Sequence, residues 1–483
     1  MLRTLLFLLV AIGLVSCGET PSPENPASAP VEAPKPAPQP APEVEQAISI
    51  YDRAEETTPI ILWLERELEG SDGVAFTDPL DAAGFRFVQL ALRMGRLDGD
   101  YVDAYHGPAI LRARAEESEV VPEQLAADIR QARTDLAQYA SSPSADPVRA
   151  ELLDKLLRGM QTRLKVIQGE TVSFNTEVTE IYDEQIPTYD LAEYDAVLAE
   201  IDRMLPGEGT TADRVDAFRN TLAIPKDKLR PVFDRAITEC RTRTQAHFDL
   251  PDGEKFRMEF VTDKSWSGYN YYQGGFESLI QINTDFPIII DRAVDLGCHE
   301  GYPGHHVWNL FIERELVGTR GWIEYSVNPL FGPFGPVAEG SANYGIQLAF
   351  PGSEKIEFER DVLFPMAGLD PAQAQKLQDL NALTGKLSHA TNEIARQYLD
   401  GALTAEEAVP LIQKYYLAST EKSAQRLRFI DKYRGYVINY NIGRDRAASW
   451  VEAAGNDPAN RWAAFEEMLT RPMTPGDIAE VVK

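Results

Sequence analysis

The chain has 483 residues, enough to bury a large core in one big domain or in two to three smaller ones. Its 47 Lys and Arg residues against 75 Asp and Glu residues give a formal net charge of −28. So acidic a surface repels phosphate backbones, and no basic stripe offsets it, which excludes nucleic acid as a partner.

The N-terminus has the pattern of a secretion signal. A positive start precedes eleven apolar residues, 5–15, which are too few to span a bilayer and typical of a signal peptide. The sequence LVSC then resembles the lipobox of bacterial lipoproteins, which implies a signal at residues 1–17, cut before a lipidated Cys17. Gly18, in place of the usual inner-membrane Asp, favours the outer membrane, facing the periplasm. The alternative is an ordinary secreted signal with a stray cysteine.

Residues 18–46 are predicted to be a tether. Nine of the 22 residues from 21 to 42 are proline, interleaved with Ala, Ser and Glu, and such a segment cannot pack a core. We therefore expect residues 47–483 to form the folded domain. The lipid at Cys17 would be its only attachment to the membrane.

Beyond the tether the pattern is mainly helical. Apolar residues recur every three to four positions, most clearly in the run Leu152, Leu153, Leu156, Leu157, Met160 and Leu164. Residues 254–287 differ, because they are rich in aromatic and β-branched residues and contain SLIQIN, which alternates like a strand. The sequence thus predicts a mainly α fold with a small β-sheet beside the histidine-rich segment that follows. Cys240 and Cys298 lie in apolar segments, and we expect two buried free thiols, although the oxidising compartment permits a disulfide between them.

Three of the six histidines, His299, His305 and His306, fall within the fifteen residues DLGCHEGYPGHHVWN. In zinc-hydrolase helices two histidines four residues apart share one metal, since that step gives about 40° of rotation and 6 Å of rise. From His299 an unbroken helix would turn about 240° to reach His305 and would rise about 10.5 Å to reach His306. An unbroken helix therefore cannot bring either histidine to the same ion.

Pro303 and Gly304 interrupt this helix and permit a bulge. A bulge that absorbs two residues would bring His305 to the second ligand position, whereas one that absorbs three would bring His306 there. The smaller bulge is simpler and favours His305, with His306 then supporting the site or facing the substrate. The alternative is that the histidines merely decorate a Pro-Gly turn.

Two acidic residues would complete a Zn²⁺ site. Glu300 directly follows the first histidine, where the general base of such motifs stands, and would take a proton from water and pass it to a leaving amine. Glu339 begins a helical segment after a Gly/Pro-rich loop and would be the third ligand. Its rivals are Glu313, Glu315 and Glu324.

These motifs resemble a known bacterial family, the domain of unknown function 885. The resemblance is carried by HEGYPGHH and EGSANYG, with YVDAYHGP and YRGYVINYNIGRD in support, and it covers most of the chain after the tether. It implies a helical metallopeptidase-like body of the gluzincin or oligopeptidase type, akin to angiotensin-converting-enzyme-like carboxypeptidases. Carried over by residue, His299 and His305 become metal ligands, Glu300 the base and Glu339 the third ligand.

Amide hydrolysis also needs a group that stabilises the oxyanion. Tyr440 is our first candidate and Tyr436 the second, since they lie four residues apart on one helical face, although such tyrosines can equally pack a helix seam. Arg444 is a candidate for substrate binding. Asn283 and Gln273 would lie on an edge strand that pairs with a peptide backbone.

Together these features predict a lipid-anchored zinc metallopeptidase of the cell envelope that acts on short peptides. One alternative is a zinc hydrolase of a non-peptide amide or ester, for which the metal and Glu300 would serve equally. The other is a metal- or peptide-binding lipoprotein without activity, although a pure binding site has no use for a base beside its ligand.

Overall fold

The computed structural model describes residues 58–71, 73–140, 145–264 and 266–482. The predicted signal peptide, the lipidated Cys17 and the tether at residues 18–46 lie outside these ranges. All described residues belong to one compact unit. None of the helices in these ranges is long and apolar enough to cross a membrane.

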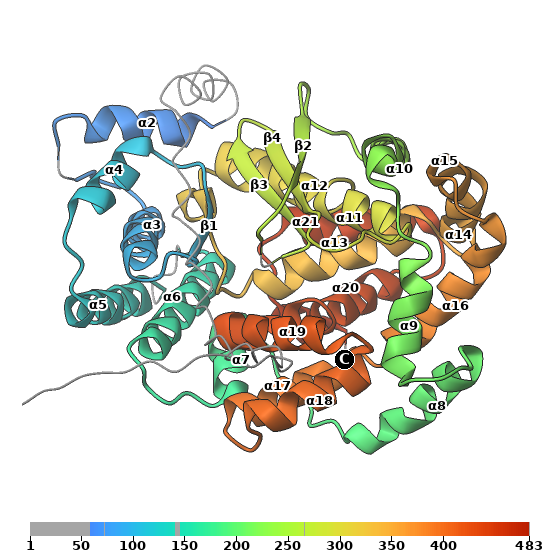
Figure 1. Ribbon diagram of the computed structural model, residues 1–483. Coiled ribbons are helices and arrows are strands. Elements are labelled where there is room, and N and C mark those ends of the chain that lie inside the picture. Colours follow the sequence, from blue (N-terminus) through green and yellow to red (C-terminus); the bar gives the residue numbers. More distant parts are fainter. Residues whose placement is uncertain (1–57, 72, 141–144, 265, 483) are drawn as a thin grey trace, which may run out of the picture. The chain divides into compact units, whose positions relative to one another are not determined.

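The first part of the described chain consists of helices and one short strand (Figure 1). These elements are α2 (Pro59–Leu68), α3 (Pro79–Leu97), β1 (Val102–Tyr105), α4 (Ala109–Glu117), α5 (Pro122–Ala140), α6 (Pro147–Ile167) and α7 (Phe174–Tyr182). Helix α6 shows why they form. Asp146 caps its first turn by accepting hydrogen bonds from two backbone N–H groups, and Pro147 occupies the first helical position. All six apolar residues of the predicted run are buried, which confirms this helix.

The central part contains the small sheet and the helices that follow it. Its elements are α8 (Asp195–Met204), α9 (Thr211–Asn220), α10 (Leu229–Gln245), β2 (Lys255–Val261), β3 (Gly268–Gly274), β4 (Glu277–Asn283), α11 (Arg292–Glu300), α12 (His305–Phe311), β5 (Val327–Pro329) and α13 (Gly335–Ala349). Strand β3 packs against α11 and α12, and both of these helices also contact α13 (Figure 1). A mainly helical body with a small sheet beside the histidine-bearing helices is thereby confirmed.

The sheet has the order β2-β4-β3, with β2 and β4 parallel and β3 and β4 antiparallel. The predicted strand SLIQIN is β4, and its alternate residues Ser278, Ile280 and Ile282 are buried. Because β4 is the central strand, the prediction that Asn283 lies on an edge is wrong. Gln273 does lie on an edge strand, at an irregularity in the register of β3.

The last part of the chain is entirely helical. It comprises α14 (Glu354–Phe358), α15 (Phe364–Ala367), α16 (Ala374–Gly385), α17 (Ala390–Leu399), α18 (Ala405–Tyr416), α19 (Thr420–Tyr433), the 3₁₀ turn η7 (Arg434–Asn439), α20 (Ile442–Ala453), α21 (Pro458–Thr470) and α22 (Pro475–Val481). Helix α20 packs closely on α13 (Figure 1). A Cβ on Gly340 would lie 2.2 Å from the carbonyl atoms of Gly443, so the two backbones touch where these glycines meet.

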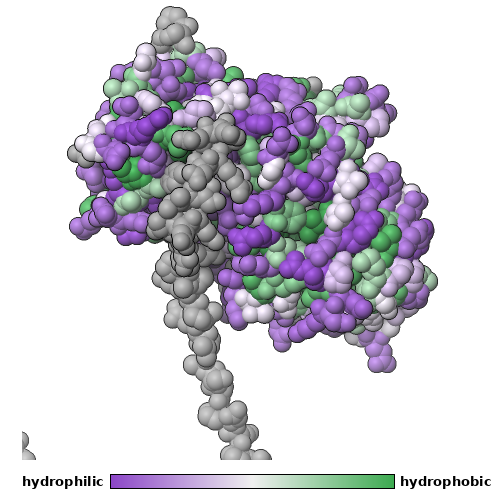
Figure 2. All heavy atoms as spheres, turned by 90° about the horizontal axis from the view of Figure 1, so that it is seen from above, coloured by the Kyte–Doolittle hydropathy of each residue, from purple (hydrophilic) through white to green (hydrophobic). Residues whose placement is uncertain are grey.

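The surface of the described residues is mainly hydrophilic. In the view of Figure 2, hydrophilic residues cover most of the coloured surface, and hydrophobic ones form separate small groups among them. The exposed large hydrophobic side chains among the described residues are few and lie on different elements: Val121, Val148, Phe286, Tyr416 and Val481. Scattered residues of this kind are ordinary for a protein surface.

A disulfide bond links α10 to α11. Cys240 and Cys298 are both fully buried and their Cα atoms are 5.5 Å apart. The prediction of two free thiols is therefore wrong. Each cysteine lies on the buried face of its helix, and the packing of α10 against α11, which residue spacing does not reveal, brings them together.

We expect the disulfide to stabilise the fold by about 2–4 kcal/mol, because it joins residues separated by 58 positions and so restricts the unfolded chain. The variant Cys240→Ala/Cys298→Ala should unfold at a lower denaturant concentration than the wild type. Reductant should lower the midpoint of the wild type and leave that of the variant unchanged. Equal midpoints for wild type and variant under oxidising conditions would contradict the prediction.

Candidate metal centre

The helix break between α11 and α12 turns the chain so that two histidines meet. Helix α11 ends at Glu300, and α12 begins at His305. The Gly304 N–H donates to the carbonyl of Cys298 at 3.0 Å, which folds the loop back onto the last turn of α11. A Cβ on Gly304 would lie 1.8 Å from the carbonyl oxygen of His299, so only glycine fits. The rings of His299 and His305 consequently stand perpendicular, with centroids 4.6 Å apart.

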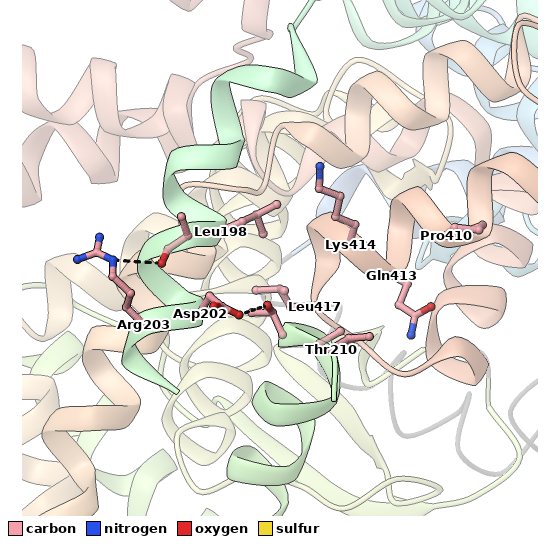
Figure 3. A pocket seen from close by; sticks show the side chains of 11 residues that line it. Leu198, Asp202, Arg203, Thr210, Pro410, Gln413, Lys414 and Leu417 are labelled. Atoms are coloured by element: carbon pink, nitrogen blue, oxygen red, sulfur yellow. Dashed lines mark hydrogen bonds between the residues drawn. The ribbon is translucent and has the colours of Figure 1, made fainter. Parts of the chain in front are cut away.

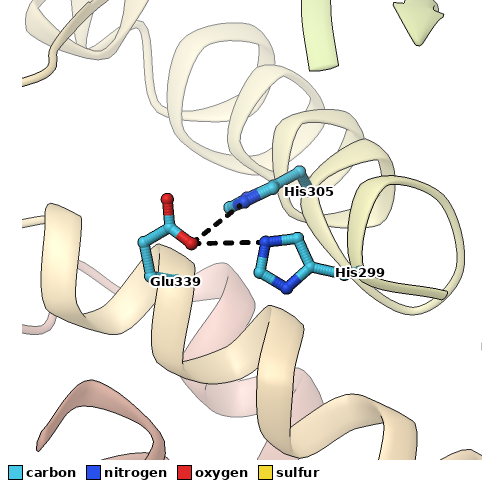
Figure 4. Close-up of side chains that lie close together, drawn as sticks. All are labelled: His299, His305 and Glu339. Carbon is cyan, nitrogen blue, oxygen red and sulfur yellow. Dashed lines mark ion pairs between the residues drawn. The ribbon is translucent and has the colours of Figure 1, made fainter. Parts of the chain in front are cut away.

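Glu339 reaches the same point from α13 (Figure 4). Its Oε2 lies 3.2 Å from Nε2 of His299 and 3.6 Å from Nε2 of His305. The three potential ligand atoms all lie within 4.8 Å of one another. Tetrahedral ligands about 2 Å from an ion are separated by roughly 3.3 Å, so this cluster is a potential metal site.

Groups around the cluster fix the orientation of two of these ligands. The Asn343 side chain donates from Nδ2 to the carbonyl of Tyr440 at 3.1 Å, which leaves its Oδ1 facing Nδ1 of His299, also at 3.1 Å. An amide oxygen only accepts, so Nδ1 of His299 carries a proton, and Nε2 is the nitrogen that faces Glu339 and could bind an ion. On the other side, the Tyr436 hydroxyl donates to Oε1 of Glu339 at 2.6 Å. Oε2 has no hydrogen-bond partner and is free to bind an ion.

Asn343 was not anticipated from the sequence, although it lies four residues after Glu339 and so on the same face of α13. If the cluster holds a metal ion, Asn343→Leu should weaken its binding about 10- to 100-fold, since supporting hydrogen bonds of metal ligands have effects of this size. Calorimetric titration with zinc measures the change. Gln347→Leu, one turn further along α13, should leave the affinity unaltered. A variant of Asn343 with wild-type affinity would contradict the prediction.

The cluster is a buried arrangement of opposite charges. Burial opposes ionisation of Glu339, but His305 and His299 outweigh it and hold its pKa well below the usual range. Burial lowers the pKa of His305, but neighbouring carboxylates, Glu339 foremost, outweigh burial and raise that pKa to about 9. Burial, with the charges of Glu339 and Glu300, also raises the pKa of Asp103 on β1 to about 7. The carboxylates around the two imidazoles therefore favour a bound cation.

Glu300, the predicted base, is the last residue of α11 and is only 4% exposed. Its carboxylate faces β3, where a Cβ on Gly268 would lie 2.8 Å from its Oε1. The Asn270 side chain of the same strand donates to the Glu300 carbonyl at 2.7 Å, which anchors the end of α11 to the sheet. Burial raises the pKa of Glu300, while His299 and His305 act in the opposite direction. The carboxylate thus lies in electrostatic contact with both histidines.

His306 faces away from the cluster and is completely buried. Its Nε2 lies 3.0 Å from Oε2 of Glu254, and its Nδ1 lies 2.8 Å from the Ser278 hydroxyl of β4. The Tyr302 hydroxyl and the Arg241 guanidinium also donate to Glu254. The structure therefore brings His305 to His299 and uses His306 to fasten α12 to the sheet. The predicted alternative, with His306 as ligand or facing the substrate, is wrong.

The other predicted site residues lie in different surroundings. Tyr440 is partly buried, with its ring centroid 5.7 Å from that of Tyr436. Arg444 is exposed on α20 and donates to Gln347 at 3.0 Å. The Asn283 side chain donates to the backbone carbonyls of Lys264 and Trp266, and it thereby closes the loop before β3.

All three rivals of Glu339 are engaged with other partners. Glu313 lies on the π-helical segment Ile312–Thr319 after α12. It accepts hydrogen bonds from the Tyr272 hydroxyl and the Gly275 N–H, which ties this segment to the β3–β4 hairpin. Glu324 pairs with Arg149 at 2.7 Å and is fully buried. Glu315, the third rival, pairs with its neighbour Arg314.

A separate pocket of about 610 Å³ lies between α8, α9 and α18 (Figure 3). Its charged groups are partnered within the protein: Asp202 accepts from the Thr211 hydroxyl and pairs with Arg214, and Lys414 pairs with Asp195 at 2.8 Å. No histidine or cysteine is among its lining residues. The cluster of His299, His305 and Glu339 is therefore the candidate functional site among the described residues.

Fold and site together define a mainly helical protein with a potential two-histidine, one-glutamate metal centre. No protein-family model matches the chain, and no curated protein matches it. Among solved structures, a "putative lipoprotein" from Colwellia psychrerythraea has a TM-score of 0.48 at 13% identity, over 76% of this chain and 69% of that one. A Pyrococcus furiosus carboxypeptidase has a TM-score of 0.37 at 12% identity, over 85% and 92% of the two chains. These scores describe a loose likeness, and the family resemblance of the motifs stays a prediction.

Proposed function

We propose that the protein is a zinc-dependent metallopeptidase that hydrolyses short peptides. The observation that carries the proposal is the convergence of His299, His305 and Glu339, with Glu300 beside them. Two imidazoles and one carboxylate are the donor set of catalytic zinc sites, which keep a fourth position open for water and substrate. Magnesium and calcium prefer sites made of oxygen ligands alone, so the two nitrogens favour a transition metal.

The residues fit such an ion for a second reason. Oε2 of Glu339 is buried, accepts no hydrogen bond, and has the ring nitrogens of His299 and His305 as its neighbours. A cation placed among these three atoms would be bound by all of them. Zinc bound there would supply Lewis-acid chemistry, namely a polarised carbonyl and a water that ionises near neutral pH.

Glu300 is the proposed general base. Its carboxylate takes one proton from the attacking water as the oxygen adds to the scissile carbonyl carbon. It then gives that proton to the amine nitrogen as the carbon–nitrogen bond breaks, so that one water is consumed and an acid and an amine are formed. Tyr440 is the proposed donor to the oxyanion, because the hydroxyl of Tyr436 is already committed to Glu339.

The edge strand β3 is the proposed place for the peptide backbone. The Gly268 end of this strand runs directly past the carboxylate of Glu300, as the short distance from a Cβ at that glycine shows. An extended peptide added to this edge would present its backbone carbonyls to the base and the metal ligands. We further propose that the chain is lipidated at Cys17 and held at the outer membrane, facing the periplasm.

Metal analysis and substrate profiling test the proposal. The protein is purified without chelators, its zinc content is measured, and it is offered a library of short peptides beside a panel of acyl amides and esters. We expect about one zinc per chain, peptide hydrolysis, loss of turnover on chelation and recovery on adding zinc. A protein that neither holds nor gains zinc would contradict the proposal. Turnover confined to the non-peptide panel would show a different hydrolase.

A further inference from the structure

The turn between α19 and α20 carries the hydroxyl that holds the third ligand. This turn, residues 434–440, comprises η7 and Tyr440. Tyr436 on it donates to Oε1 of Glu339 at 2.6 Å, and the Tyr440 carbonyl accepts from Asn343 at 3.1 Å. Both contacts go to α13. The turn therefore contributes one of the contacts that orient the carboxylate of Glu339.

The turn begins with a strained residue. Arg434 has φ +50° and ψ −120°, outside the regions that residues with a side chain usually adopt. Backbone strain of this kind costs about 1–3 kcal/mol and persists only where surrounding contacts impose it. In this protein one carboxylate on α7 contacts both Arg434 and the residue after it.

That carboxylate is Glu177, which is completely buried. Its Oε2 accepts from Nε of Arg434 at 2.7 Å, and its Oε1 accepts from the Gly435 N–H at 3.0 Å. The Arg434 guanidinium also donates to the carbonyl of Val172, just before α7. Glu177 thus holds two consecutive residues of the turn. It binds Arg434 through that residue's side chain and Gly435 through its backbone N–H.

Packing from α7 reinforces these hydrogen bonds. A Cβ on Gly435 would lie 3.2 Å from Oε1 of Glu177 and 3.2 Å from the ring of Tyr182, so the turn is pressed closely against the helix. The Tyr182 ring also meets the Tyr436 ring edge to face, with centroids 6.4 Å apart. Helix α7 therefore contacts the turn both through hydrogen bonds and through aromatic packing.

We propose that Glu177 is a positioning residue of the metal centre: by holding Arg434 and Gly435, it sets the Tyr436 hydroxyl against the ligand Glu339. The inference rests on the proposed zinc site and extends it to α7, which contributes no ligand. Without the carboxylate, Arg434 can relax to an ordinary negative φ, and Tyr436 then moves away from Glu339. The ligand would lose the donor that orients it.

A double-mutant cycle on zinc affinity tests this inference. Tyr436→Phe removes the hydroxyl and should weaken zinc binding about 10- to 100-fold. Glu177→Gln places an amide N–H₂ group against donors and should weaken zinc binding by a similar factor. Because both changes act through one hydrogen bond, the double variant should bind zinc no more weakly than Tyr436→Phe alone. Calorimetric titration gives each dissociation constant without relying on turnover.

Glu184→Gln is the matched control. Glu184 is also buried, at 3% exposure, and also pairs with Nε of an arginine, Arg446, at 2.7 Å, but it does not touch the turn. We expect this variant to melt at a lower temperature and to bind zinc like the wild type. Should Glu177→Gln fail to fold, Arg434→Lys replaces it in the cycle, because lysine keeps the charge but lacks the Nε donor.

Three outcomes would overturn the inference alone, and a fourth would overturn the proposed function with it. The inference would be overturned if the losses of zinc affinity in the two single variants multiplied in the double variant. A folded Glu177→Gln protein with wild-type zinc affinity would also overturn it. Equal losses in Glu184→Gln and Glu177→Gln would reduce Glu177 to a general stabilising role and also overturn it. A wild-type protein without zinc affinity would instead refute the proposed function and this inference together.

Discussion

Replacing Glu300 by glutamine should abolish most turnover while leaving zinc in place. Glutamine has the same size and still fits beside Gly268, but it cannot take a proton from water. General bases contribute about 10²- to 10⁴-fold to rates, so we expect a fall in kcat of that order. Zinc content should stay at the wild-type level, because Glu300 is not one of the three clustered ligand groups. Steady-state kinetics on the best peptide, with metal analysis of the same samples, measure both quantities.

Glu315→Gln is the control for this experiment. Glu315 lies on the π-helical segment Ile312–Thr319 that follows α12, is partly exposed and pairs with Arg314, so its replacement should leave kcat unchanged. A Glu300→Gln protein with wild-type kcat would show that another group removes the proton. Zinc bound without turnover of any amide, in wild type and variant alike, would favour a binding protein.

Replacing Gly304 by alanine should destroy zinc binding and lower stability. The added Cβ would lie 1.8 Å from the His299 carbonyl oxygen and 2.5 Å from that of Cys298, distances at which backbone must move. Because both clashing atoms are backbone, no side-chain rotation relieves the contact. We expect α12 to be pushed away from α11, which separates His305 from His299. Zinc titration and thermal melting would record the two effects.

Gly385→Ala provides the comparison for Gly304→Ala. Gly385 ends α16, and a Cβ there would have no atom within 4 Å. Alanine is also the better helix former by about 1 kcal/mol, so this variant should keep zinc affinity and lose no stability. If Gly304→Ala bound zinc like Gly385→Ala, the loop between α11 and α12 would be more adaptable than the structure indicates.

The helix break itself could be predicted from sequence, because it follows from local chain geometry. Pro303 and Gly304 act on the residues next to them, and the angular step between histidines is fixed by the helix. Which histidine turns inward depends on partners far along the chain. His306 is held by Glu254 and Ser278, and neither residue is marked as its partner by spacing.

The contrast between local chain geometry and long-range packing also explains which other predictions were confirmed and which were wrong. The amphipathic helices and the strand SLIQIN follow from periodicity, which the sequence displays directly. The Cys240–Cys298 bond, the role of Asn343 and the exclusion of Asn283 from an edge depend on which helices and strands become neighbours. Tyr436 was predicted as a site residue. Its hydrogen bond to Glu339 could not be predicted, because that bond depends on how the turn at residues 434–440 packs against α13.

The contact between Gly340 and Gly443 has a consequence for how the molecule could admit a substrate. Where two helices touch backbone to backbone, neither can slide or rotate without the other. Helix α13, which carries Glu339, and the first turn of α20 should therefore move together as one rigid part of the site. We expect any opening around a peptide to occur on the facing side, where Asp103 and β1 approach the cluster, and amide exchange should be faster there than in α13.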